Sequence, residues 1–119
     1  MKKILVVDDE EILRMLIVDT LEDLDFIIHE APDGLAALEQ LQKENYDLMI
    51  LDYMMPSMTG IEVLTHIPSA VREKMKVLML TAKTQEKDKQ EMLKAGTDFF
   101  MAKPFSPLDL MSVVEEILQ

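Results

Sequence analysis

The sequence predicts an α/β fold in which a five-stranded parallel sheet is covered by helices on both faces. Five short apolar runs of strand length recur along the chain, and segments with helical apolar spacing separate most of them. The runs are almost continuously apolar instead of alternating with polar residues. Strands of this composition are buried on both faces, which is typical of parallel sheets whose strands are joined by crossover helices.

The first expected strand belongs to KILVV, and the third to DLMIL, both of which end directly before aspartates. Each run is bounded by polar or turn-forming residues, as strands in compact domains are. The five expected strands cover residues 4–7, 26–30, 47–51, 76–80 and 98–102.

Apolar residues with a spacing of three or four positions predict the first, second and last helices. These residues are Ile12, Leu13, Leu16, Ile17, Leu21 and Leu24, then Leu35, Leu38 and Leu41, and finally Leu110, Met111, Val114, Ile117 and Leu118. The fourth helix, expected within residues 84–95, has no apolar residue before Met92. We therefore expect little burial along its first two turns, which fits either a movable element or a solvated helix face without a role.

Capping residues agree with these assignments. Asp33 is a candidate N-cap, Thr59 and Glu62 have the spacing of a capping box, and Gly96 is suited to end a helix. Ser106 followed by Pro107 predicts the start of the last helix, because proline is favoured at the first helical position.

Length and composition limit the possible functions. A chain of 119 residues fits one domain spanning residues 1–119. The 12 basic and 23 acidic residues give a net charge of −11, which argues against direct nucleic-acid binding. No apolar stretch has the length of a membrane span, and the absence of cysteine fits a reducing compartment, so we expect a cytoplasmic protein without membrane insertion.

Polar residues follow four of the five strands, where ligands bind in open parallel sheets. Asp8 and Asp9 follow the first strand, Asp52 the third, Thr81 the fourth and Lys103 the fifth. Asp9 taken alone is better explained as a helix N-cap, whereas Thr81 alone could be a loop hydroxyl and Lys103 alone a solvated charge. The coincidence of all five at one edge is what indicates a functional site.

Three carboxylates at one edge require a counter-charge, and Mg²⁺ is a common cation with oxygen ligands. Asp52 could then act as a nucleophile toward phosphorus and form an aspartyl phosphate. Such a transfer needs a cation, a fixed positive charge and careful positioning. Asp8 and Asp9 are the candidates for holding the cation, Lys103 for the positive charge and Thr81 for a hydroxyl donor.

The motifs VVDDEE, LMILDYMMP with the following TG, LTA at 80–82 and KPF at 103–105 resemble the receiver domains of two-component response regulators, the CheY-like family. The resemblance covers essentially the whole chain. It implies the flavodoxin-like strand order 2-1-3-4-5. It also implies that Asp52 accepts the phosphoryl group and that Asp8, Asp9, Asp52 and the backbone carbonyl of Met54 bind Mg²⁺.

The resemblance further implies a switch in which Thr81 moves toward the phosphoryl group and Phe100 turns inward. Because Phe100 has no hydroxyl, this switch would depend on packing. A cis Lys103-Pro104 peptide bond is implied too, and X-Pro bonds are those in which cis is accessible.

The predicted function is therefore that of a receiver in a two-component phosphorelay. It would accept phosphate from a histidine kinase or phosphotransfer protein and present an altered face, formed by the fourth helix, fifth strand and fifth helix, to a downstream protein. It would catalyse only its own phosphorylation and dephosphorylation and would not be an enzyme in the usual sense.

The main alternative is an Mg²⁺-dependent aspartate-nucleophile phosphatase of the haloacid dehalogenase kind. That family requires a second aspartate two positions after the nucleophile, where this chain has Met54. A flavin-binding module is a further alternative, but the acidic residues after the first strand would repel a phosphate there.

Overall fold

The computed structural model describes residues 1–119 and confirms the α/β prediction. Strands and helices alternate along the chain, with one additional short helix before the fourth strand. The elements are β1 (Lys2–Val7), α1 (Glu11–Glu22), β2 (Phe26–Ala31), α2 (Gly34–Lys43), β3 (Leu48–Asp52), α3 (Gly60–Thr65), α4 (Ser69–Arg72), β4 (Lys76–Thr81), α5 (Glu86–Lys94), β5 (Phe99–Ala102) and α6 (Pro107–Ile117).

The five strands form one parallel sheet in the order β2-β1-β3-β4-β5, which confirms the order implied by the family resemblance. In the register of the sheet, Val7 pairs with Ala31 on one side and Leu51 on the other. Asp52 pairs with Leu80 of β4. The carboxyl ends of β1, β3 and β4 are thereby brought to the same edge, which we call the carboxyl edge.

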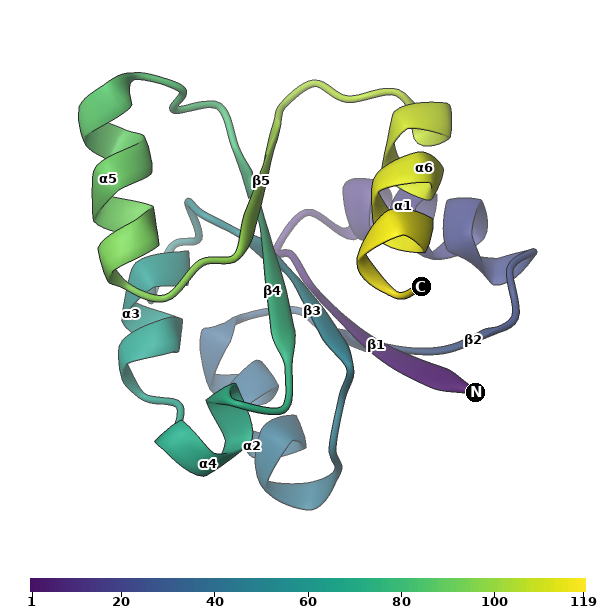
Figure 1. Ribbon diagram of the computed structural model, residues 1–119, viewed down its shortest axis with the longest axis horizontal. Coiled ribbons are helices and arrows are strands. Elements are labelled where there is room, and N and C mark those ends of the chain that lie inside the picture. Colours follow the sequence, from purple (N-terminus) through teal and green to yellow (C-terminus); the bar gives the residue numbers. More distant parts are fainter.

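Helices cover both faces of the sheet, with α1 and α6 on one face and α2, α3 and α5 on the other (Figure 1). Alternate residues of each strand point to opposite faces, so two separate apolar clusters form. Ile4 and Ile50 pack with Ile17 and Val114 in the first cluster. The larger cluster contains the intervening strand residues together with side chains of α2, α3 and α5. None of the helices combines the length and apolar character needed to cross a membrane.

The predicted capping residues are confirmed. The Asp33 and Ser106 side chains accept hydrogen bonds from the backbone amides three residues later, and Thr59 with Glu62 forms a complete capping box. Gly96 has a φ of 104°, a conformation that residues with a side chain rarely adopt, and it follows the end of α5. Local sequence signals therefore determine where several of the helices begin and end.

The helices before and after β4 can be compared with the sequence prediction: one was not predicted, and the other agrees with it. Helix α4 was not predicted, because its four residues form a single turn with no buried side chain and therefore show no apolar periodicity. The expected fourth and fifth helices consequently correspond to α5 and α6. In α5 only Met92 is buried, which agrees with the low burial expected for its first two turns.

Candidate functional site

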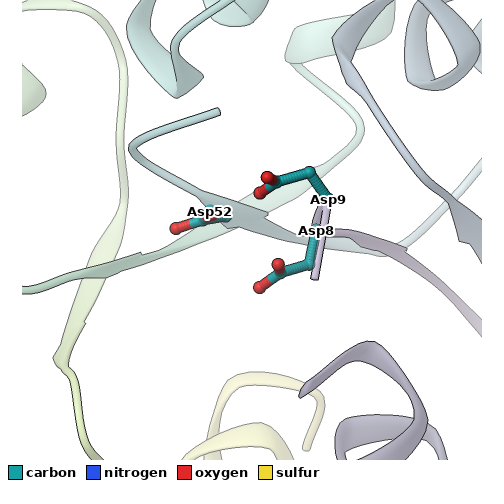
Figure 2. A group of neighbouring side chains, drawn as sticks. All are labelled: Asp8, Asp9 and Asp52. Atoms are coloured by element: carbon teal, nitrogen blue, oxygen red, sulfur yellow. The ribbon is translucent and has the colours of Figure 1, made fainter. Parts of the chain in front are cut away.

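The carboxyl ends of β1 and β3 bring three carboxylates together (Figure 2). Asp52 is the last residue of β3, and Asp8 and Asp9 immediately follow β1, the neighbouring strand. Carboxylate oxygens of these three residues lie within 4.8 Å of one another. Asp8 and Asp52 are buried while Asp9 is exposed, so the group lies at the surface with two of its members facing inward.

Asp8 is held from several directions. Its backbone amide donates to the carbonyl oxygen of Ala31 at 3.2 Å, which continues the β1–β2 ladder. Its Oδ1 accepts a hydrogen bond from the backbone amide of Glu10 at 2.8 Å. Its Oδ2 is buried and accepts no hydrogen bond, although the ammonium nitrogen of Lys103 lies 3.7 Å away. One buried carboxylate oxygen is thus fixed in place without a hydrogen-bonding partner.

Lys103, which follows β5, provides the basic side chain of the site. Its Nζ donates to Oδ1 of Asp52 at 2.8 Å. Burial lowers the pKa of Lys103, but the hydrogen bond to Asp52 and the nearby negative charge of Asp8 outweigh burial and raise it above its usual value. The lysine is therefore a permanent positive charge beside the carboxylates.

For the carboxylates, the pKa shifts favour the uncharged form, whereas the shift of Lys103 favours the charged form. Burial raises the pKa of Asp52 to about 6, against the lowering effect of Lys103, and the negative charges of Asp8 and Asp9 raise it further. Burial likewise raises the pKa of Asp8 above its usual value. One lysine thus does not fully compensate the charge of this group.

The donor set fits a hard divalent cation such as Mg²⁺, which prefers oxygen ligands and commonly binds through one or two carboxylates. The buried Oδ2 of Asp8 without a hydrogen bond is the kind of atom that such an ion would satisfy. The carbonyl oxygen of Met54, two residues after Asp52, accepts no hydrogen bond within the protein. These observations make Asp8, Asp9 and Asp52 a compatible set of ligands.

Thr81 is less directly connected to this group. It ends β4 and lies at the same edge, but its hydroxyl accepts a hydrogen bond from the backbone amide of Lys83 at 2.9 Å and makes none with Asp52. Thr81 and Phe100 both line a cavity of about 150 Å³ between β4, β5 and α5. The Lys103-Pro104 peptide bond is cis, as the family resemblance implied.

Two local details depart from the sequence analysis. Glu10, and not Asp9, is the N-cap residue of α1, and its side chain makes no capping bond. Arg14, which the sequence analysis did not single out, donates from Nη1 to the backbone carbonyl oxygen of Asp8 at 2.7 Å. An arginine in the second turn of a predicted helix carries no sequence signal that it returns to the loop before that helix.

Sequence comparison relates the chain to known proteins. A model of the response regulator receiver domain family matches residues 4–115. The transcriptional regulatory protein SrrA of Staphylococcus aureus is 38% identical over 117 residues, which cover 98% of this chain and 48% of SrrA. The chain thus spans about half the length of the curated relatives it matches.

Solved structures give the same relationship. The chemotaxis response regulator CheY4 of Vibrio cholerae has a TM-score of 0.92 and 34% identity, with 98% of each chain covered. The response regulator TrrA of Thermotoga maritima, solved in complex with Mg(2+)-BeF, has a TM-score of 0.85 and 33% identity, with 98% of this chain and 99% of TrrA covered.

Proposed function

The chain belongs to the response regulator receiver domain family, and from this membership we propose that Asp52 accepts a phosphoryl group in a two-component pathway. The phosphoryl donor would be a histidine kinase or a phosphotransfer protein. The observation that carries the proposal is the position of the Asp52 carboxylate, which lies within 4.8 Å of Asp8 and Asp9 and accepts a hydrogen bond from Lys103.

The proposed transfer is a substitution at phosphorus. A carboxylate oxygen of Asp52 forms the new bond to phosphorus while the bond between phosphorus and the donor's imidazole nitrogen breaks, and the bonding electron pair stays with that nitrogen. Lys103 holds Asp52 in place and supplies positive charge where negative charge develops. The protein's contribution is thus positioning and electrostatic stabilisation.

We propose that Asp8, Asp9, Asp52 and the carbonyl of Met54 hold Mg²⁺ at this site. When bound, Mg²⁺ supplies positive charge that neutralises phosphoryl oxygens and reduces repulsion among the carboxylates. The buried Oδ2 of Asp8 supports this assignment, and TrrA, a related response regulator, has been crystallised with Mg(2+)-BeF.

We further propose that phosphorylation alters the face formed by α5, β5 and α6, where a downstream protein binds. The Thr81 hydroxyl, which donates to the carbonyl oxygen of Lys83 at 3.5 Å, would donate to the phosphoryl group instead. Phe100 would then move into the cavity that it shares with Thr81. Helix α5 is suited to move with this change, because Met92 is its single buried residue.

On this proposal the chain catalyses only its own phosphorylation and dephosphorylation. A phosphatase of the haloacid dehalogenase kind is not favoured, because position 54 is a largely exposed methionine that cannot protonate a leaving group. Turnover of simple phosphate esters distinguishes the two functions, since a phosphatase hydrolyses many ester molecules per chain, while a receiver carries at most one phosphoryl group at a time and does not turn over such esters rapidly.

Intact mass spectrometry tests the proposal. With acetyl phosphate and Mg²⁺, the wild-type chain is expected to gain one base-labile phosphoryl group, while Asp52→Asn gains none. Asp47→Asn is a matched control, because Asp47 precedes β3 at its other end and should leave phosphorylation unchanged.

The same experiment can contradict the proposal. A phosphoryl group on Asp52→Asn, or none on the wild type under conditions in which the chain is folded, would exclude Asp52 as the acceptor. Phosphorylation of equal extent after chelation of divalent ions would exclude the metal-assisted form of the proposal.

A further inference from the structure

Arg14 connects three elements of the fold near the carboxylate group. From α1, its Nη1 donates to the backbone carbonyl oxygen of Asp8 at 2.7 Å. Its Nε pairs with Oε1 of Glu30, near the end of β2, at 3.0 Å. The side chain of Arg14 is 15% exposed. The guanidinium thus lies between α1, the edge strand β2 and the loop that carries Asp8 and Asp9.

This contact completes the immobilisation of Asp8. The amide of Asp8 is bonded to Ala31, its Oδ1 to the amide of Glu10, and its carbonyl oxygen to Arg14. The remaining polar atom, Oδ2, faces the site without a hydrogen bond. Of the four polar atoms of Asp8, only the one available to a cation has no such bond.

We propose that Arg14 is a positioning residue that fixes the Asp8–Asp9 loop for binding of a divalent cation, with Glu30 holding its guanidinium in place. The inference rests on the proposed Mg²⁺ site. It assigns to Arg14 and Glu30 a role in cation affinity although neither is placed among the ligands.

The role assigned to Arg14 follows from its geometry: it holds the backbone of Asp8 and the side chain of Glu30 at the same time. Its bond goes to the carbonyl oxygen of Asp8 and leaves the carboxylate free. A guanidinium can donate to two partners in a fixed plane, whereas the single ammonium nitrogen of lysine cannot reproduce both bonds with the same geometry.

At the opposite end of the sheet, where the strands begin, a second arginine makes the same kinds of contact as Arg14. Arg72, the other arginine, is 20% exposed, donates to the carbonyl oxygen of Met75 and pairs with Asp98 at 2.9 Å. Both arginines therefore make one bond to a backbone carbonyl and one ion pair with a carboxylate. Arg72 lies far from the carboxylates in the fold, because Met75 and Asp98 precede β4 and β5.

Calorimetric titration of the full chain with Mg²⁺ tests the inference. Arg14→Met should bind Mg²⁺ about 10-fold more weakly than the wild type, the lower end of the loss typical when a residue supporting a metal ligand is removed. Arg72→Met should bind with wild-type affinity although it also loses a carbonyl bond and an ion pair. Arg14→Lys, which can restore one of the two bonds, should fall between the wild type and Arg14→Met.

Two further measurements separate positioning from general destabilisation. In the metal-free protein, hydrogen exchange of the Glu10 amide, which bonds to Asp8, should accelerate in Arg14→Met and not in Arg72→Met. Glu30→Ala removes an exposed carboxylate and leaves the apolar core unchanged. It should weaken Mg²⁺ binding less than Arg14→Met does.

The outcomes are distinct. Equal Mg²⁺ affinity in the wild type and Arg14→Met would overturn the inference while leaving the metal site intact. Equal weakening in Arg14→Met and Arg72→Met would also overturn it, because the effect would then be general destabilisation. A wild-type chain that binds no Mg²⁺ would overturn the proposed metal site itself and this inference with it. If Arg14→Met does not fold, wild-type affinity in Glu30→Ala and Arg14→Lys would overturn the inference.

Discussion

Asp8 and Asp52 at one end of the sheet and Glu44 at the other have pKa values shifted in opposite directions. At the carboxyl edge, burial raises the pKa of Asp52 to about 6 and that of Asp8 above its usual value. At the opposite edge, where the strands begin, the hydrogen bond from Lys3 lowers the pKa of Glu44, which is half-buried.

The two edges also differ in how their charges are paired. Where the strands begin, Glu44 pairs with Lys3 at 3.1 Å and Asp98 pairs with Arg72 at 2.9 Å. The side chain of Asp47 accepts a hydrogen bond from the backbone amide of Lys3 at 2.8 Å. At the carboxyl edge, one lysine serves a group of three carboxylates.

This difference separates charged residues that stabilise the fold from charged residues that form the candidate site. Paired charges at the beginning of the strands hold loops and helices against the sheet. At the carboxyl edge the negative charges are incompletely compensated, so their repulsion destabilises the folded chain and favours binding of a cation. This is the pattern expected of a functional site. Equivalent substitutions at both edges test this contrast.

The largest effect is expected for removal of the lysine at each edge. Lys103→Met removes the cation that bonds to Asp52, and we expect phosphorylation by acetyl phosphate to slow by about 100-fold, as when one stabilising donor is lost from an active site. Lys3→Met removes the partner of Glu44 and should not change this rate. The time course of the phosphoryl mass measures both, and equal rates in the two variants would contradict the contrast.

A smaller effect, of opposite sign at the two edges, is expected for aspartate-to-asparagine substitutions. Asp8→Asn removes one of the crowded charges and supplies an amide that can donate to neighbouring carboxylates, so the free energy of unfolding without Mg²⁺ should rise by about 1 kcal/mol. Asp98→Asn weakens the ion pair with Arg72 and should lower the free energy of unfolding by about 1 kcal/mol. Urea denaturation measures both, and a loss of stability in Asp8→Asn would be inconsistent with charge crowding.

The last effect has no influence at neutral pH and is confined to alkaline pH. Burial and the nearby Glu44 raise the pKa of Tyr46 from 10.0 to about 12. Because the folded pKa is the higher one, this tyrosine contributes stability that is complete below pH 10.0 and is lost as the pH rises toward 12. We expect the wild type to lose about 1 kcal/mol per pH unit more than Tyr46→Phe in this window.

Denaturation at several pH values checks this prediction. Tyr53→Phe is the companion variant at the carboxyl edge: burial also raises the pKa of Tyr53, so this variant should likewise lose less stability than the wild type at alkaline pH. Equal pH dependence in the wild type and Tyr46→Phe would show that burial and Glu44 do not raise the pKa of Tyr46.

Much of the fold could be predicted from the sequence, because each strand is an apolar run buried on both faces. The predicted and observed strand boundaries differ by no more than two residues, as for the first strand, which begins at Lys2 and not at residue 4. The caps at Asp33, Thr59 and Ser106 could be predicted because a capping side chain bonds to an amide three residues away. Helix α4 could not, since one exposed turn leaves no periodic pattern.

The sequence by itself determined which residue types follow each strand, because strand length and polarity are local properties. It therefore identified Asp8, Asp9, Asp52, Thr81 and Lys103 as residues of a common edge. Only the tertiary structure decided their contacts: Lys103 bonds to Asp52, whereas the Thr81 hydroxyl bonds to the Lys83 amide. The tertiary structure alone also revealed that Arg14 supports Asp8, because that contact depends on how α1 packs beside β2 and not on any local pattern.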